Sequence, residues 1–492
     1  MTHPLTGGVA PSASARRTAW AEGFDQLRAG ATTEPGRLRI IGAVLAALVI
    51  AFGGVTAWQV SDRAAAASDV VDRSQPLSAD AASIYRSLAD ADTSAAAGFL
   101  AGGQWPRDVR ERYERNINTA SELLVRAAAN SAGAESARRQ IAKLNEELPV
   151  YTGLIEQARA NNRQGLPLGG AYLRYANDRM RTELLPAARA LYDAETARLG
   201  SDYDDAKAWP WAALGVGVAT LAALIWAQRR NYHRTNRVFN RGLLAATATS
   251  AVVLLWLAGG HAVAVSGLNK SYDDGARSLR VLNEARIGSL QARGDESLTL
   301  VARGAVLTDD GKDFYEVGYG SAMGKLVGTK STSGAAGTNE ASGATSGDGK
   351  AGREGGAGQD GEPRGTADRG TLLARAEQLA DDAEGREPVR KAMASVADWR
   401  QKHRAAREDD EGGNYEEALD TVIGNGTTTG TYFDQVDANL RTALAHEQRE
   451  FTQAADSGRG AFTGLPAGAA VLALLGAVGA VLGMGRRLSE YR

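Results

Sequence analysis

The chain contains the stretch YLRYANDRMRTEL at residues 172–184 and repeats its pattern as YFDQVDANLRTAL at residues 432–444. A tyrosine, an Arg-Thr pair and a final leucine occupy the same positions in both stretches. Apolar or small residues recur at every fourth position, which places them on one face of a helix. These positions are Tyr172, Ala176, Met180 and Leu184 in the first stretch, and Tyr432, Val436, Leu440 and Leu444 in the second. The repeat predicts a helical module that is present twice. The alternative is convergence between two helices rich in alanine and arginine.

A weaker similarity lies upstream in each half of the chain. DTSAAAGFLAGG at residues 92–103 resembles DESLTLVARGA at residues 295–305, and the two stretches begin with Asp92 and Asp295. Both stretches are expected on the first helix of their module. Matches at two corresponding places support an internal duplication more strongly than either match alone.

Four long apolar segments separate the polar parts of the chain. Each is nearly free of charge and long enough to cross the hydrocarbon core of a membrane as a helix. The segments are 40–60, 209–227, 242–265 and 462–484. One such segment alone is compatible with a buried core helix, but four with arginine-rich flanks predict membrane spans. The first begins too late and is too long for an ordinary signal peptide, so we expect an uncleaved anchor.

The distribution of arginine sets the expected orientation. Positive residues concentrate in cytoplasmic segments of membrane proteins. Here they cluster in the leader 1–39, the loop 228–241 and the tail 485–492. The loop contributes Arg229, Arg230, Arg234, Arg237 and Arg241. We therefore expect a multi-pass protein of the plasma membrane with both termini in the cytoplasm. These five arginines are also candidate contacts for a cytoplasmic partner, although topology alone accounts better for most of them.

Two large polar segments, 61–208 and 266–461, are then expected outside the membrane. Helical periodicity and short turns predict an up-down four-helix bundle in each. In the second, we expect one helix from the third span to about residue 322, and an Ile-Gly-Asn-Gly break near residue 423. Residues 327–370 are rich in Gly, Ser and Thr and are predicted to be disordered. The fold class is thus an all-α membrane protein with four transmembrane helices and two extracytoplasmic four-helix bundles in tandem.

Composition excludes several classes of function. A net charge of −2 argues against a nucleic-acid partner. The chain has no cysteine, and its five histidines show no metal-ligand spacing, so neither a metal nor another cofactor is expected. No catalytic motif is present, and the spans contain too few polar residues to line a channel. The cytoplasmic segments are too short to bury a core. We expect a protein without enzymatic activity that passes any signal to a partner.

Four charged residues are candidate ligand contacts. Asp92 and Asp295 lie at corresponding places on long helices, and Arg181 and Arg441 occupy the same position of the repeat. An arginine can pair with a ligand carboxylate. The competing interpretation is that the aspartates lie on solvated helix faces and the arginines flank a core. In the fourth span, Gly464, Gly468, Gly479 and Gly483 form two G-x-x-x-G motifs, which favour close helix packing.

The layout resembles two known groups. Paired helical bundles, each held between two spans, resemble chemoreceptor-type four-helix sensor modules. The whole arrangement is similar to the GlnX-like four-span membrane proteins of actinobacteria. The resemblance rests on the topology, the duplication and the missing output domain, so it carries over no site residue. The low-complexity insert at 327–370 departs from the pattern.

The resemblance implies a relay of amino-acid availability. A solute-binding lipoprotein would dock on the bundles, and the signal would pass through the membrane to a soluble serine/threonine kinase. Membrane lipid is the remaining partner, and a homo-oligomer stays open. The competing hypothesis is a structural or accessory membrane protein, such as an assembly factor or a transporter companion, without a sensing role.

Overall fold

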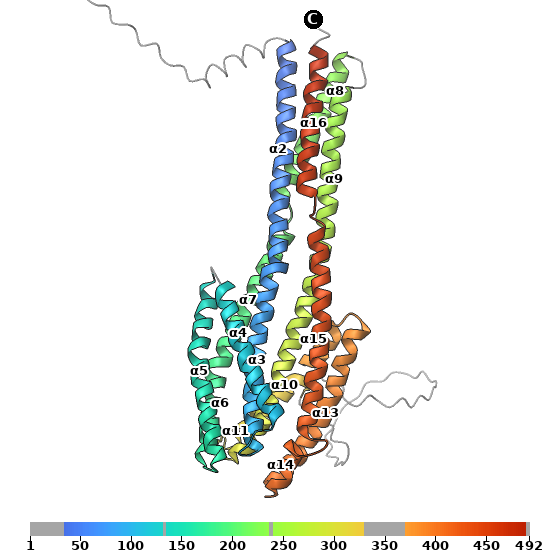
Figure 1. Ribbon diagram of the computed structural model, residues 1–492. Helices are drawn as coiled ribbons and strands as arrows, with labels where there is room; N and C mark the ends of the chain where they lie inside the picture. The colour runs from blue at the N-terminus through green and yellow to red at the C-terminus, as the bar shows by residue number, and fades with distance from the viewer. Residues whose placement is uncertain (1–33, 131–133, 236–239, 329–369, 489–492) are drawn as a thin grey trace, which may run out of the picture. The chain divides into compact units, whose positions relative to one another are not determined.

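The computed structural model describes residues 34–130, 134–235, 240–328 and 370–488 (Figure 1). Within these ranges every regular element is a helix, and there is no β-strand beyond one isolated bridge between Leu307 and Asp313. The all-α fold class is therefore confirmed. Most of the leader, nearly all of the low-complexity insert and residues 236–239 of the basic loop lie outside the described residues. The predicted disorder of the insert stays a prediction.

The first half of the described chain contains ten helical elements, two of which are π-helices. In chain order they are α2 (Glu34–Asp69), η1 (Val70–Ser74), α3 (Gln75–Leu100), α4 (Arg107–Asn130), α5 (Glu135–Arg163), α6 (Leu168–Arg179), η2 (Met180–Leu184), α7 (Leu185–Lys207), α8 (Trp211–Thr235) and α9 (Arg241–Lys270).

The second half follows the same plan with more interruptions. Its elements are η3 (Ser271–Ala276), α10 (Arg277–Ala302), α11 (Phe314–Val327), α12 (Leu372–Leu379), α13 (Ala383–Glu411), α14 (Tyr415–Ile423), α15 (Thr429–Gly460) and α16 (Leu465–Leu488). The break predicted near residue 423 is present between α14 and α15. The prediction of one helix to residue 322 was wrong, because α10 ends where Arg303 and Gly304 adopt positive φ values of 48° and 71°.

Two of the π-helices have a local cause in the sequence. Each ends two residues before a proline, namely Pro76 after η1 and Pro186 after η2. Proline has no N–H to donate to the preceding turn, and its ring crowds the carbonyl four residues back. Widening that turn into a π-helix removes the conflict. Such bulges occur frequently at functional sites, and η2 lies at the candidate site described below.

The chain separates into two compact units. The described parts of 1–65, 206–265 and 459–492 form one, which we call the apolar unit. It contains the apolar segments of four helices long and apolar enough to cross a membrane. Large apolar side chains such as Leu255 and Leu482 are more than 60% exposed there, as lipid-facing side chains are in the absence of lipid. These findings support a multi-pass membrane protein.

Glycines bring two helices of the apolar unit close together. A Cβ on Gly479 would lie 3.1 Å from the carbonyl oxygen of Gly242, and one on Gly483 would lie 2.9 Å from the Cα of Gly242. A Cβ on Gly468 would clash with the ring of Trp256. Of the four predicted packing glycines, the three that lie in α16 thus face α9. Gly464 instead lies in the turn before α16 with a φ of 79° and no neighbour within 4 Å.

The described parts of 66–205 and 266–458 form the other unit, which we call the bundle unit. The first copy of the duplicated module supplies α3 to α7 and the second supplies α10 to α15. One hydrophobic core runs through both, since Leu124 and Tyr151 of the first copy belong to the same buried cluster as Trp399 and Leu440 of the second. The first helices of the two copies, α3 and α10, pack against each other. The sequence placed a bundle in each half, and the structure joins both into one body.

Candidate functional site

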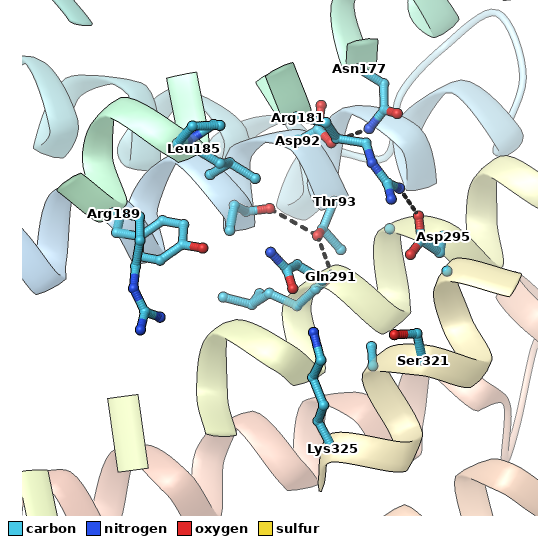
Figure 2. Close-up of a pocket in the computed structure, with 17 residues that line it drawn as sticks. Asp92, Thr93, Asn177, Arg181, Leu185, Arg189, Gln291, Asp295, Ser321 and Lys325 are labelled. Atoms are coloured by element: carbon cyan, nitrogen blue, oxygen red, sulfur yellow. Dashed lines mark hydrogen bonds and ion pairs between the residues drawn. The ribbon is translucent and has the colours of Figure 1, made fainter. Parts of the chain in front are cut away.

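A cavity of about 360 Å³ lies where the two copies meet (Figure 2). The first copy lines it with α3, α6, η2 and α7, and the second copy lines it with α10 and α11. The polar lining residues are Tyr85, Asp92, Thr93, Asn177, Arg181, Arg189, Gln291, Asp295, Ser321 and Lys325. Three of the four candidate ligand contacts, Asp92, Arg181 and Asp295, are therefore brought together in one cavity.

Asp92 of α3 is almost completely buried at this cavity, with 8% of its surface exposed. Its carboxylate accepts a hydrogen bond of 2.6 Å from the side-chain amide of Asn177 and one of 3.2 Å from the hydroxyl of Tyr151. Both donors are neutral, and the described residues place no ion-pair partner on Asp92. The burial of Asp92 excludes the competing interpretation, in which this residue lies on a solvated helix face.

Asp295 of α10 is 4% exposed and pairs with the guanidinium of Arg181 across the interface between the copies (Figure 2). Gly318 of α11 makes room for this carboxylate, because a Cβ at that position would clash with Oδ2 of Asp295. Arg181 lies on the π-helix η2, one residue after its start. Among the described contacts, Arg181 is thus the only charged side chain of η2 that reaches the second copy.

Burial shifts the protonation of both carboxyl groups. Loss of hydration raises the pKa of Asp92 to about 6, although the hydrogen bonds from Asn177 and Tyr151 and the charge of Arg181 oppose the rise. Burial likewise raises the pKa of Asp295 to about 7 against the opposing charge and hydrogen bond of Arg181. The negative charges of Asp92 and Glu316 add to the rise at Asp295.

The raised pKa of Asp295 predicts that the bundle unit loses stability as the pH rises. In the unfolded chain this group releases its proton near its ordinary pKa of 3.8, whereas the folded protein keeps it to about pH 7. The stabilising contribution is therefore complete below the unfolded pKa and is lost as the pH rises through the folded pKa. We expect Asp295→Asn to flatten the dependence of the melting temperature on pH across that window.

The matched control for this measurement is Asp309→Asn, because Asp309 is exposed in the loop after α10. The melting temperature of Asp309→Asn should depend on pH with the same slope as that of the wild-type protein. Equal slopes for Asp295→Asn and the wild type would contradict the assigned protonation of Asp295.

Thr93 ties the two copies together beside the carboxylates. Its hydroxyl lies 2.9 Å from the carbonyl oxygen of Ala89 on its own helix and 2.9 Å from that of Leu290 on α10. At the mouth, Arg189 is held by Asp193 and Glu284. Lys325 is exposed there, and within the described part of the chain no ion pair or hydrogen bond occupies its ammonium group.

Arg441, the fourth candidate, lies outside this cavity. Its guanidinium is 2.9 Å from a carboxylate oxygen of Asp437, four residues earlier on α15, and its side chain is 57% exposed. Asp437 is buried and also pairs with Arg286 at 2.5 Å. Burial has the largest single effect and would raise the pKa of Asp437. These cations together nevertheless hold the pKa below its ordinary value. Arg441 therefore lies beside a buried ionic cluster.

A second cavity, of about 280 Å³, lies at the place related to the first by the duplication. It is lined by α3, α4, α10 and α15. Arg112 of α4 crosses it and pairs with Asp90 at 2.8 Å and with Asp434 at 3.0 Å. Arg293 is 6% exposed and bonded to Glu296 and Thr429. Ion pairs between the chain's own residues thus engage the arginines of this second cavity, and the first remains the better ligand site.

Among the described residues, two overlapping groups of side chains have the composition of a metal site. Asp382, Glu384 and His446 offer ligand atoms within 4.8 Å of one another, and so do Asp381, Asp382 and Glu450. However, Asp382 accepts a hydrogen bond of 2.7 Å from the backbone N–H of Gly385 as the cap of α13, and it lies 3.1 Å from His446 Nε2. These contacts give the group a structural role at the start of α13.

The predicted cytoplasmic contacts are described only in part. Arg229 and Arg230 lie near the end of α8, with Arg230 over the ring of Trp226 at 5.4 Å. Arg241 begins α9 and is exposed. Arg237 lies outside the described residues, and of Arg234 only the backbone is described.

Sequence reasoning missed Asn177, Tyr151, Gly318 and Lys325 at the site. One signal was available for Asn177, because it interrupts the repeated stretch at the position of Asp437. A polar residue beside an apolar stripe in both copies marks a buried polar position. No local pattern marks Gly318 or Lys325, which reach the site through the packing of α11 against α10.

Residues 66–204 match the family model of the actinobacterial sensor domain. This segment is the first copy of the module and includes Asp92, Asn177 and Arg181. The match supports a sensing or signalling role for an actinobacterial membrane protein. No curated protein and no solved structure matches the chain. Asp295, Gly318 and Lys325 lie beyond the matched segment, so the second copy completes the cavity.

Proposed function

We propose that this protein is a transmembrane signal transducer without catalytic activity, and that the cavity between the two copies is its sensory site. The observation that carries the proposal is the continuity of the two helices that supply Asp92 and Asp295. Helix α3 continues α2 through η1, and α10 continues α9 through η3, with no residue outside a helical element. A ligand between α3 and α10 would act directly on two helices that lead into candidate spans.

A small displacement is enough for such a mechanism. Signalling proteins move helices by an ångström or two at packed interfaces, and rigid elements carry the shift because cores have discrete packings. In both copies a π-helix lies between the apolar segment and the helix that carries the aspartate. The irregular hydrogen bonding of these turns provides matching places where each helix can adjust without breaking.

The proposed partners are those that the resemblance implies. We propose that the protein reports amino-acid availability, in concert with a solute-binding lipoprotein outside, to a serine/threonine kinase inside. The arginines that flank α8 and α9 are the proposed kinase contacts. The competing proposal, a structural or accessory membrane protein, requires neither an occupied cavity nor a kinase.

The proposed orientation predicts the labelling of introduced cysteines, and the absence of native cysteine makes the experiment clean. A membrane-impermeant maleimide applied to intact cells should label Gln164→Cys, which lies in the turn after α5. It should not label Thr235→Cys at the end of α8 until the membrane is permeabilised. Labelling of position 235 in intact cells would reverse the proposed topology.

The kinase proposal predicts an effect of the basic loop. Replacing Arg229, Arg230 and Arg241 with glutamine should reduce at least several-fold the amount of serine/threonine kinase that co-purifies with the full chain. The matched control replaces Arg107, Arg138 and Arg139, three exposed arginines of the bundle unit, and removes the same charge. Equal kinase recovery from both variants and the wild type would favour the accessory role.

A further inference from the structure

We propose that the cavity binds a small zwitterion, with its ammonium group at the carboxylates of Asp92 and Asp295 and its carboxylate at Lys325. This inference rests on the proposed function and names the ligand class of the sensory site. The charge, the hydrogen-bonding capacity and the size of the cavity each support this inference.

The inner end of the cavity has an excess of negative charge when both aspartates are ionised. Two buried carboxylates share one guanidinium, that of Arg181. An uncompensated buried charge is costly, and it is relieved either by a proton or by a cation. An ammonium group supplies the missing charge at neutral pH, and so replaces the proton that burial would otherwise retain there.

The carboxylates also have acceptor positions to offer. An ionised carboxylate provides about four lone-pair directions. The described partners of Asp92 are the two neutral donors Asn177 and Tyr151, and that of Asp295 is Arg181. An ammonium group brings three donors and no acceptor. It therefore complements this end of the cavity in both charge and hydrogen bonding.

The mouth of the cavity has the opposite character. Arg189 is occupied by Asp193 and Glu284, which leaves Lys325 as the cation available to a ligand. Its side chain extends from α11 toward Gln291, with Ser321 on the same helix nearby (Figure 2). A ligand carboxylate can pair with Lys325 and accept from the amide of Gln291. A purely cationic ligand would leave this lysine unpaired, and a purely anionic one would face two aspartates.

The size agrees with a small molecule. Ligand pockets span roughly 300–1,000 Å³, and this cavity, at about 360 Å³, lies at the lower end. A molecule of the size of an α-amino acid fits this volume, whereas a folded peptide segment does not. Most of the polar lining comes from helices, so the two charged ends are held apart by rigid elements.

Binding is expected to depend on pH, since protons compete for the same carboxylates. The charged groups that influence the pKa of Asp295 are Arg181 of η2, Asp92 of α3 and Glu316 of α11, and Tyr315 of α11 interacts with both aspartates. Tyr151 of α5 donates a hydrogen bond to Asp92, and Lys325 of α11 lines the same cavity. Affinity for the zwitterion should fall as the pH drops below about 6, where both aspartates are protonated.

The test is calorimetric titration of the full chain in lipid nanodiscs with each of the twenty standard L-α-amino acids. The tightest binder is then compared with its decarboxylated amine and its deaminated acid. We expect at least one amino acid to bind, and both analogues to bind at least tenfold more weakly. Failure of every amino acid to bind, or equal binding of the deaminated acid, would overturn the proposal.

Two variants assign the ends of the ligand. Lys325→Gln should weaken the amino acid at least tenfold and leave the amine analogue unaffected, whereas Asp295→Asn should weaken both. Lys312→Gln, in the exposed loop before α11, is the matched control and should bind as the wild type does. Because Lys325 is exposed, its variant is expected to fold, and unchanged amino-acid affinity in it would refute the assigned orientation.

These titrations are independent of signalling. Amino-acid binding without any response of the spans would preserve the ligand class and remove the proposed function. A response of the spans to changes in the cavity, without amino-acid binding, would do the reverse.

Discussion

Replacing Trp399 with alanine is expected to lower the free energy of unfolding of the bundle unit by about 3–5 kcal/mol. Trp399 is completely buried in the core that the two copies share. Its ring packs edge-on against Phe433 at 5.6 Å and Tyr319 at 6.1 Å between centroids. Its indole N–H donates to Glu296 at 3.0 Å. The substitution therefore leaves a large cavity and removes a hydrogen bond from a buried carboxylate.

Chemical unfolding followed by circular dichroism measures this loss, with Trp399→Phe as the control that keeps most of the volume and should cost less. A probe on α5 of the first copy should report the same shift as a probe on α13. Unfolding of the second copy alone, with an unchanged transition at α5, would contradict the shared core.

Replacing Glu296 with leucine is expected to destabilise the bundle unit by a similar amount, about 3–5 kcal/mol, because it breaks a buried ion pair from one side. Glu296 is 1% exposed and pairs with Arg293. It also accepts from Trp399 and lies 3.0 Å from His403 Nδ1 and 3.0 Å from the hydroxyl of Thr429. Removing it leaves the guanidinium of Arg293 buried without its carboxylate.

The pKa values of Glu296 and His403 define the pH at which the loss of stability is best measured. Arg293 and His403 hold the pKa of Glu296 below its ordinary value despite burial, the largest opposing effect. Burial favours neutral His403, but the carboxylates of Glu296 and Glu316 raise its pKa to about 9. The contribution of Glu296 is lost as the pH falls through its lowered pKa, and that of His403 is lost as the pH rises through about 9. A pH between the ordinary pKa of 4.5 for Glu296 and that of 6.5 for His403 thus shows the full effect.

A double variant separates the lost pair from lost packing. Arg293→Met combined with Glu296→Leu removes both charges and should recover part of the stability, since no lone charge stays buried. The double variant could instead be less stable than Glu296→Leu, by the full cost of a second core substitution. That result would show that loss of the ion pair does not cause the destabilisation.

Local sequence patterns predicted much of the fold. The fourfold spacing around Met180 and Leu440 predicted the buried stripe, and both residues are completely buried. The apolar segments predicted four candidate spans. The contact between α3 and α10 was not predictable in the same way, because nothing in the periodicity of one helix specifies which other helix covers it.

The residues of the candidate site were likewise not predictable from the pattern of one helix alone. Arg181 and Arg441 occupy one position of the repeat, yet only Arg181 reaches the cavity. The difference lies four residues earlier, where the second copy has Asp437 and the first has Asn177. Asp437 carries a charge and pairs with Arg441 on the same helix. Asn177 carries none, which leaves Arg181 able to pair with Asp295 of the other copy. The sequence contained this difference, but its meaning depended on the partner across the interface.

The central claim is that the cavity between the copies controls the spans, and pulsed electron paramagnetic resonance tests it most directly. Nitroxides at positions 37 and 241 report the distance between the ends of α2 and α9 in nanodiscs. Gly318→Leu pushes a side chain against the carboxylate of Asp295, whereas Gly320→Leu, on the same helix, has open space around it. We predict that Gly318→Leu shifts the distance by an ångström or two and that Gly320→Leu leaves it unchanged. Identical distance distributions in both folded variants and the wild type would contradict the claim.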